Sequence, residues 1–282
     1  MQNMLRRLKA LRLLKNKVVL ITGGSQGIGR ALALEAARRG AIVVVCARNE
    51  EALVAVEREC LILSGRPAFH YQLDVTNPDK VDAVLATVQH EVGTIDVLVN
   101  AAGLGDMQPV VKQSSQMMQT MLQVNLLATM YLSRRVAQQM MDQGAGAIIN
   151  LGSLAGKIPT PHSAVYSATK AGVIQFDNIL RMEVADYGVQ VLTVNPGPVD
   201  TAFFDKADPS GQYRAMLPRQ LVLTADQLAQ QVWDNVGHKT REINVPAATT
   251  YWSWLYSLVP GLGDWAIKRA FNYQQDKQHL DD

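Results

Sequence analysis

A serine, a tyrosine and a lysine stand at a spacing that suits proton transfer to a carbonyl oxygen. Ser153 follows a short apolar run, and Tyr166 and Lys170 come thirteen and seventeen residues later. Residues four apart share one face of a helix, so the phenol and the ammonium can address one point. A tyrosine has an ordinary pKa near ~10, and a lysine cation beside it lowers that pKa by stabilising the phenolate. The three residues therefore predict acid–base chemistry at an oxygen.

Glycines form a second cluster, directly after the run VVLIT at 18–22 and before a helical pattern at 27–39. Exposed N–H groups and the dipole at a helix N-terminus attract a pyrophosphate, and glycines allow its close approach. The position of this cluster predicts a dinucleotide site, whereas a turn alone is the plainer alternative. The expected contacts here are Gly23, Ser25, Gln26, Gly27, Ile28 and Gly29.

The end of the second apolar run bears on the choice of dinucleotide. A carboxylate there would bind the ribose hydroxyls of NAD, whereas a cation would attract the extra phosphate of NADP. This chain has Ala47 and then Arg48, with Ser25 and Asn49 able to add hydrogen bonds. These residues favour NADP(H), and an unpaired surface arginine is the alternative.

These motifs resemble the short-chain dehydrogenase/reductase family over about residues 17–245, and within it the NADP(H)-preferring bacterial carbonyl reductases. The resemblance implies that Tyr166 exchanges a proton with the substrate oxygen, that Ser153 hydrogen-bonds this oxygen and that Lys170 also holds the nicotinamide ribose. It implies that Asn125 anchors a water in a proton relay, although a helix-kinking or capping role is open. Uncharged Gln26 departs from the basic residue frequent at its position. The further implied cofactor contacts are Asp74, Val75, Asn100, Ala101, Ala102, Gly103, Pro196, Gly197, Val199 and Thr201.

Short apolar runs alternate with helical stretches along the chain. This order predicts an α/β, doubly wound Rossmann fold with a seven-stranded parallel sheet and helices on both faces. The expected strands are 18–22, 41–47, 68–75, 95–100, 146–151, 189–194 and 242–245, and the expected helices are 27–39, 50–64, 78–92, 114–142, 163–187 and 225–236.

The predicted organisation has one catalytic domain with an extension at each end. Residues 1–16 form a basic amphipathic extension, 17–246 the Rossmann domain and 247–282 an aromatic helical extension. Within the domain, 202–220 reads as a loop-like substrate lid, with a surface excursion as the alternative. The expected apolar wall of the substrate site comprises Met107, Leu154, Ala155, Phe203, Phe204 and Tyr213.

Composition excludes several classes of protein. Twenty-seven Lys and Arg against 25 Asp and Glu leave a net charge of +2, which argues against nucleic-acid binding. Two cysteines and the lack of a signal peptide favour a cytoplasmic location. We expect no metal site, since the histidines show no ligand spacing: His70, His90, His162, His238 and His279.

The N-terminal and C-terminal segments leave open whether the protein contacts a membrane. Basic residues around Leu5, Leu8 and Leu11 suit an anionic membrane surface, and a frayed extension is the alternative. The tryptophans and tyrosines after residue 247 suit a membrane interface, the substrate cleft or a subunit contact. The family resemblance implies a homo-dimer or homo-tetramer through the helices at 114–142 and 163–187.

The predicted activity is NADPH-dependent reduction of a small, apolar ketone or aldehyde to an alcohol by hydride transfer. A 3-oxoacyl thioester reductase and a hydroxysteroid-type dehydrogenase are the enzymatic alternatives. A dinucleotide-binding sensor or scaffold without turnover is the alternative from another class. An intact set of Ser153, Tyr166, Lys170 and Asn125 argues against the last, because binding alone does not need it.

Overall fold

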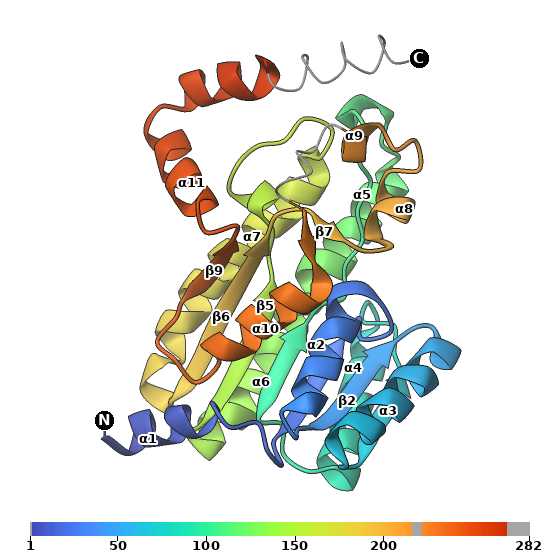
Figure 1. Cartoon of the computed structure of the whole chain (residues 1–282), viewed down its shortest axis with the longest axis vertical. Coiled ribbons are helices and arrows are strands. Elements are labelled where there is room, and N and C mark those ends of the chain that lie inside the picture. Colours follow the sequence, from blue (N-terminus) through green and yellow to red (C-terminus); the bar gives the residue numbers. More distant parts are fainter. Residues whose placement is uncertain (1, 216–221, 270–282) are drawn as a thin grey trace.

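The chain folds into three layers, a central sheet with helices on both faces (Figure 1). The computed structural model describes residues 2–215 and 222–269. The seven strands of the sheet are all parallel in the order β3-β2-β1-β4-β5-β6-β9, which confirms the predicted doubly wound Rossmann fold. The strands are β1 (Val18–Thr22), β2 (Ile42–Ala47), β3 (Ala68–Gln72), β4 (Val97–Asn100), β5 (Gly146–Leu151), β6 (Val189–Pro196) and β9 (Glu242–Val245).

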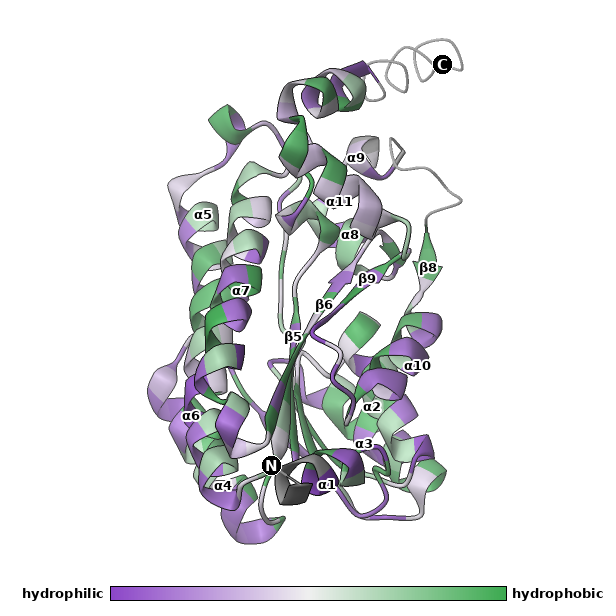
Figure 2. Cartoon of the chain, turned by 90° about the vertical axis from the view of Figure 1, so that its left-hand side faces the viewer, coloured by the Kyte–Doolittle hydropathy of each residue, from purple (hydrophilic) through white to green (hydrophobic). Residues whose placement is uncertain are grey.

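Helices cover the sheet in two groups, one on each side (Figure 2). Every residue of β1, β4, β5 and β6 is buried, because helices exclude water from both faces. Such strands are continuous apolar runs, and for this reason they can be found from sequence. One group comprises α2 (Gly27–Arg38), α3 (Glu50–Ser64) and α10 (Ala225–Asn235), and the other α4 (Pro78–Glu91), α6 (Ala128–Gln143) and α7 (Ala164–Glu183).

The strand order places the candidate site. The sheet grows from β1 in two directions, so the carboxyl ends of β1 and β4 form a topological switch point, where ligands bind in open α/β sheets. The loops after β1, β2, β4, β5 and β6 all reach this end of the sheet. They carry many of the candidate residues, whereas Asn125, Tyr166 and Lys170 lie on helical segments.

The two longest predicted helices differ from expectation. The stretch 114–142 divides into α5 (Ser115–Met121), a π-helical turn (Leu122–Leu127) and α6. The stretch 163–187 ends as α7 at Glu183 and is followed by a 3₁₀ turn. Hydrophobic spacing predicts that such helices exist, whereas tertiary packing decides where the backbone changes its hydrogen-bond pattern.

The predicted lid is more ordered than a loop. It contains α8 (Phe203–Ala207) and α9 (Gln212–Ala215), and the short pair β7 (Val199–Asp200) and β8 (Leu223–Thr224) frames it. Residues 216–220 of the prediction lie outside the described residues. The name lid is used below for residues 202–215.

The basic N-terminal segment is attached to the body. After α1 (Gln2–Ala10), Leu11 and Leu14 are buried in the core with α2 and α10. The guanidinium of Arg12 donates to the carbonyl of Gly237 at 3.2 Å. The predicted boundary at residue 16 is therefore too late, because the core begins at Leu11.

The C-terminal segment, in contrast, leaves the body. It contains α11 (Thr249–Leu258) and a second helical stretch at 260–269, which we call together the C-terminal arm (residues 249–269). The arm starts just beyond the carboxyl end of β9, and the N-terminus lies at the opposite end of the molecule (Figure 1). No helix within residues 2–215 and 222–269 has the length and apolar content needed to cross a membrane.

Candidate active site

The glycine loop between β1 and α2 forms a cradle that side chains would fill. A Cβ on Gly23 would lie 2.7 Å from the Cα of Ala102, and one on Gly24 would lie 2.9 Å from the Cβ of Val45. A Cβ on Gly29 would overlap the carbonyl of Gly23, so the helix packs directly on the turn. The N-cap of α2, Gln26, makes no side-chain cap, which leaves the first N–H groups of the helix for an anion. This geometry fits a dinucleotide pyrophosphate.

Thr201 lies beside the same loop. A Cβ on Gly27 would be 3.5 Å from the Cβ of Thr201, so the loop after β6 reaches the start of α2. Pro196 ends β6, and the N–H of Gly197 donates to the carbonyl of Val245 at 2.7 Å. The structure therefore brings this loop and the glycine loop together, as the sequence predicts.

Arg48 stands at the end of β2 with an exposed side chain that makes no ion pair within the described residues. Its backbone carbonyl accepts a hydrogen bond from the amide of Gln72 at 3.0 Å. Asn49 is occupied locally, because its side chain caps α3 by accepting from the N–H of Ala52 at 3.1 Å. The guanidinium of Arg48 is thus available to a phosphate, whereas the side-chain oxygen of Asn49 already accepts a hydrogen bond within α3.

Asp74 and Asn100, near the ends of β3 and β4, use their side chains for hydrogen bonds within the protein. The carboxylate of Asp74 accepts from the N–H and the hydroxyl of Thr76 at 3.0 and 2.8 Å, and the N–H contact is the main reason why its pKa is lowered. Asn100 is buried, and its amide donates to Ser133 at 3.0 Å and to Asn150 at 2.8 Å. The Asn100 side chain therefore fixes β4 beside β5, and a contact of this residue with a cofactor stays a prediction.

The predicted catalytic side chains come together at the carboxyl end of β5. The side chain of Ser153 lies near the hydroxyl of Tyr166 and lowers the pKa of that phenol. The oxygen of Ser153 also accepts from the N–H of Ala155 at 3.1 Å, which fixes its rotamer. The ammonium of Lys170 donates to the carbonyl of Leu151 at 2.6 Å and lies 5.8 Å from the centre of the Tyr166 ring. One turn of α7 thus carries the phenol and the ammonium to one place.

Burial sets the proton affinities of this group. Desolvation raises the pKa of Tyr166 to about 12, and the hydrogen bond with Ser153 acts in the opposite direction. Desolvation lowers the pKa of Lys170 to about 8. The sequence predicts that Lys170 lowers the pKa of the phenol, whereas in the structure desolvation raises it. The phenol is therefore protonated at neutral pH.

Asn125 lies in the π-helical turn and is buried. Its amide exchanges two hydrogen bonds of 2.9 Å with the backbone of Leu104, and it donates to the hydroxyl of Thr169 at 3.1 Å. Its backbone carbonyl accepts from Thr129 at 3.0 Å. Asn125 therefore ties the loop after β4 to the residue just before Lys170.

An aromatic wall covers the phenol. The ring of Phe203 lies 5.8 Å from the ring of Tyr166, and Phe204 lies 5.4 Å beyond it. Met107 and Tyr213 are buried in the same cluster. Of the predicted wall residues, the structure brings these four together, whereas Leu154 and Ala155 are half-buried beside Ser153.

Contacts hold the lid in this place. The N–H of Met107 donates to the carbonyl of Ala207 at 2.7 Å, and Arg214 pairs with Asp200 at 2.6 Å. A Cβ on Gly105 would lie 2.7 Å from the end of the Phe203 ring, so the glycine admits that ring. The lid therefore packs apolar side chains against the Tyr166 ring.

A comparison with known proteins identifies the family. The family model described as short chain dehydrogenase matches residues 17–211. The chain belongs to the short-chain dehydrogenase family. As a short-chain dehydrogenase it is an oxidoreductase that acts on CH–OH or C=O groups, and its fold binds NAD or NADP.

Relatives of known structure or name agree with this membership. The 3-oxoacyl-(acyl-carrier-protein) reductase FabG of Vibrio cholerae is 38% identical over 188 residues, which are 67% of this chain and 75% of that protein. The ketoacyl reductase HetN of a Nostoc species is 33% identical over 233 residues, 82% of this chain and 79% of that protein. A solved short-chain dehydrogenase from Sphingobium yanoikuyae in complex with NADPH is 29% identical and covers 87% of this chain and 94% of its own, with a TM-score of 0.76.

This short-chain dehydrogenase also has residues near the site that the sequence did not reveal. Asp177 is fully buried on α7 and accepts from Asn150 at 2.5 Å and from Thr193 at 2.7 Å. Burial raises its pKa to about 6. Asp177 lies seven residues after Lys170, two turns along the same helix, and this spacing is a signal that could have found it. No group of three or more His, Cys, Asp or Glu in the described part of the chain is placed to hold a metal.

Proposed function

We propose that this short-chain dehydrogenase reduces an apolar ketone or aldehyde to an alcohol with NADPH. One observation carries the proposal: the Tyr166 hydroxyl lies beside Ser153 and beneath the aromatic wall of Phe203. A phenol with a pKa of about 12 is protonated at neutral pH, so it can give a proton to a nascent alkoxide. Proton donation is the role that carbonyl reduction requires.

In the proposed mechanism the cofactor supplies the hydride to the carbonyl carbon. Ser153 and Tyr166 donate hydrogen bonds to the carbonyl oxygen, and these bonds strengthen as negative charge develops on it. Tyr166 then gives its proton to the oxygen. Lys170 holds positive charge near the resulting phenolate and hydrogen-bonds the ribose, and Asn125 keeps the neighbouring loop in register with α7.

The glycine cradle and the start of α2 would hold the pyrophosphate, and Arg48 would bind the 2′-phosphate. Support for NADP over NAD comes from the free guanidinium at the end of β2 and from the NADPH named for the Sphingobium structure. Replacement of Arg48 by Ala keeps the backbone contact with Gln72. We expect it to lower kcat/KM for NADPH about 10- to 100-fold with little change for NADH, in contrast to Arg58→Ala on the exposed side of α3.

The reductase proposal is tested by NADPH oxidation with a panel of apolar ketones and aldehydes. Tyr166→Phe should lower kcat/KM at least ~100-fold, because it removes the proton donor and keeps the ring. Tyr187→Phe, at an exposed tyrosine outside the site, is the matched control. NADPH binding without turnover across the panel would favour the sensor or scaffold instead.

A 3-oxoacyl thioester reductase is the second candidate, because FabG and HetN are both named for ketoacyl reduction. The two candidates differ in the group attached to the carbonyl. A higher kcat/KM for a 3-oxoacyl thioester than for its free ketone counterpart would favour the thioester activity.

A homo-dimer or homo-tetramer is also proposed, through the exposed side of the π-helical turn (Leu122–Leu127), α6 and α7. Apolar side chains are exposed there, including Leu127, Ile179 and Met182. Light scattering on the full chain and on a Met182→Glu variant tests the contact, since a charge in an apolar interface favours separation. The predicted cytoplasmic location stays a prediction.

A further inference from the structure

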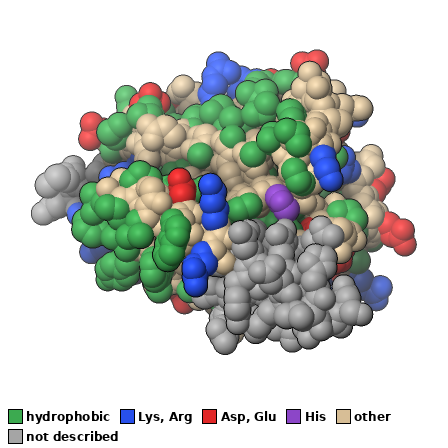
Figure 3. Space-filling view, turned by 90° about the horizontal axis from the view of Figure 1, so that it is seen from above, with side chains coloured by type: hydrophobic (Ala, Val, Ile, Leu, Met, Phe, Trp, Pro, Cys, Tyr) green, Lys and Arg blue, Asp and Glu red, His purple; other side chains and the backbone are tan. Residues whose placement is uncertain are grey.

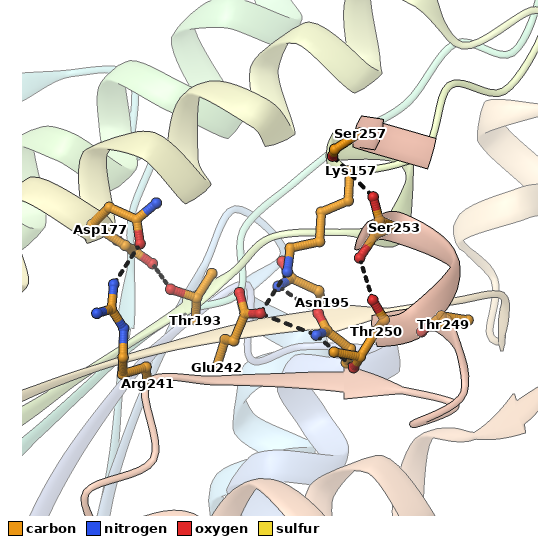
Figure 4. A network of polar contacts seen from close by, with 12 residues as sticks. Lys157, Asp177, Thr193, Asn195, Arg241, Glu242, Thr249, Thr250, Ser253 and Ser257 are labelled. Carbon is orange, nitrogen blue, oxygen red and sulfur yellow. Dashed lines mark hydrogen bonds and ion pairs between the residues drawn. The ribbon is translucent and has the colours of Figure 1, made fainter. Parts of the chain in front are cut away.

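In α11, the first helix of the C-terminal arm, the side chains that contact the body are polar, and the large apolar side chains lie in solvent. Thr249 is buried, and Thr250 accepts a hydrogen bond of 3.0 Å from the amide of Asn244 on β9. Figure 4 shows Thr250, Ser253 and Ser257 in a row on the side of α11 toward Lys157. A surface helix normally turns its apolar side to the core. The reverse orientation indicates that something outside the body covers the apolar side.

The exposed side of the arm is large and aromatic. Its most exposed large side chains have between 58 and 77% of their surface in solvent: Tyr251, Trp252, Trp254, Leu258, Leu262 and Trp265. Contiguous apolar surface of this kind marks a contact site, whereas single exposed apolar residues need no explanation. The fourth tryptophan, Trp233, is buried in the body.

Charge along the arm favours a lipid surface as the occupant. Residues 249–263 contain no charged side chain, and Asp264, Lys268 and Arg269 follow, which gives the described arm a net charge of +1. Asp264 accepts a hydrogen bond from the hydroxyl of Tyr256 at 2.9 Å. Arg269 lies 5.7 Å from the centre of the Trp265 ring, so a cation and an aromatic ring are presented together. Tryptophan, tyrosine and leucine with flanking cations are typical of helices that lie in the interface of an anionic membrane. A helix of ten residues, such as α11, is too short to span a bilayer.

The arm lies at the same end of the molecule as the candidate site. It begins after β9, at the edge of the sheet where the strand ends and the lid lie (Figure 1). Seen from this end, hydrophobic side chains gather in patches, with Lys and Arg side chains among them (Figure 3). The basic N-terminal segment is at the opposite end, so a flat surface against the arm would not also contact that segment.

We infer that the C-terminal arm lies on an anionic lipid surface and turns the lid toward it, so that the enzyme takes apolar carbonyl compounds dissolved in the membrane. The docking step depends only on the arm. The statement about substrate delivery rests on the proposed reductase function.

Docking is tested with the full chain and vesicles of phosphatidylcholine, with and without phosphatidylglycerol. The variant Trp254→Ser/Leu258→Ser removes two exposed side chains one turn apart. The matched control Leu13→Ser/Ile62→Ser removes two side chains that are 75 and 72% exposed, one on the N-terminal segment and one on α3. We expect the wild type and the control to co-sediment with phosphatidylglycerol vesicles and the arm variant to bind at least ~5-fold less.

Charge and fluorescence give independent readings. The variant Lys268→Glu/Arg269→Glu should lose binding to phosphatidylglycerol vesicles. Tryptophan emission should shift to shorter wavelength on vesicle addition, because three of the four tryptophans are in the arm. The docking inference is overturned if the wild type binds neither kind of vesicle, or if the arm variant binds as well as the control. It is also overturned if the arm variant alone loses self-association without vesicles, because a second copy of the chain would then be the occupant.

Delivery is tested by reduction of a long-chain ketone in vesicles and of a water-soluble ketone without them. The arm variant should lose at least about fivefold of the first rate and keep the second. Equal loss of both rates, or of neither, overturns delivery. Absence of both activities in the wild type would overturn the reductase proposal and with it delivery, while the vesicle-binding result would still decide docking.

Discussion

Replacement of Lys170 by methionine should abolish activity and at the same time stabilise the fold at neutral pH. The ammonium is buried, and burial lowers its pKa from 10.5 to about 8. A shift of this size costs about 3 kcal/mol of folding free energy at pH 7, where the lysine is charged in both states. Methionine has a similar length and removes this cost. It also removes the hydrogen bond to the carbonyl of Leu151, and this loss offsets about 1 to 3 kcal/mol of the stability gained.

The dependence on pH separates these two effects, because the lost hydrogen bond is the same at every pH. Between about pH 8 and 10.5 the unfolded wild type binds more protons than the folded one, so the wild type gains stability as pH rises. The variant has no such gain. The difference in unfolding free energy, variant minus wild type, should therefore fall by about 2 to 3 kcal/mol from pH 7 to pH 10.

The assay is urea unfolding of both proteins at the two pH values, with Lys112→Met at an exposed lysine as the control. Activity is measured by NADPH oxidation, and kcat/KM of the Lys170 variant should fall at least ~100-fold. A stability difference that stays constant between pH 7 and pH 10 would refute the argument that desolvation controls this lysine.

Three further variants test the surroundings of the site. Gly152→Ala should destabilise the protein by about 1 to 3 kcal/mol and lower kcat. The added Cβ would overlap the buried side-chain oxygen of Asn195 and displace the loop after β5. Equal unfolding curves for the variant and the wild type would contradict this prediction. Asp177→Asn should gain about 2 kcal/mol relative to wild type between pH 4 and pH 7. Because the folded pKa is raised from 3.8 to about 6, the wild type loses stability as pH rises between these two values. Paired unfolding curves without this trend would refute it. Phe203→Ala should raise KM for an apolar ketone about fivefold, with a smaller effect on kcat. The reason is that the ring packs on Tyr166 and not on a reacting atom. An unchanged KM would show that the Phe203 ring does not contact the substrate.

The seven parallel strands of the sheet and the meeting of Ser153, Tyr166 and Lys170 could be predicted from sequence. Buried parallel strands are apolar throughout, and i, i+4 spacing on a helix fixes the direction of two side chains. Both features depend on local periodicity, which a sequence shows directly.

Other features depend on packing between distant segments. Asn100 ends a strand in a motif that suggests a ligand contact, yet its side chain turns inward because Ser133 and Asn150 offer partners there. Desolvation of Tyr166 depends on the lid, which is far away in sequence. The burial of Asp177 is likewise set by β5 and β6 and not by its own helix.

The burial of Leu11 and Leu14 has a practical consequence for where a shortened form of this protein can begin. The family match starts at residue 17, and β1 starts at Val18, so residue 17 is the obvious place to cut. A chain cut there would lose two leucines that are 2% exposed. Each such loss costs about 2 to 5 kcal/mol, and domains are commonly stable by only about 5 to 15 kcal/mol. A shortened protein that starts before Leu11 should therefore fold and express, whereas one that starts at Lys17 should be poorly soluble for reasons unrelated to membranes or catalysis.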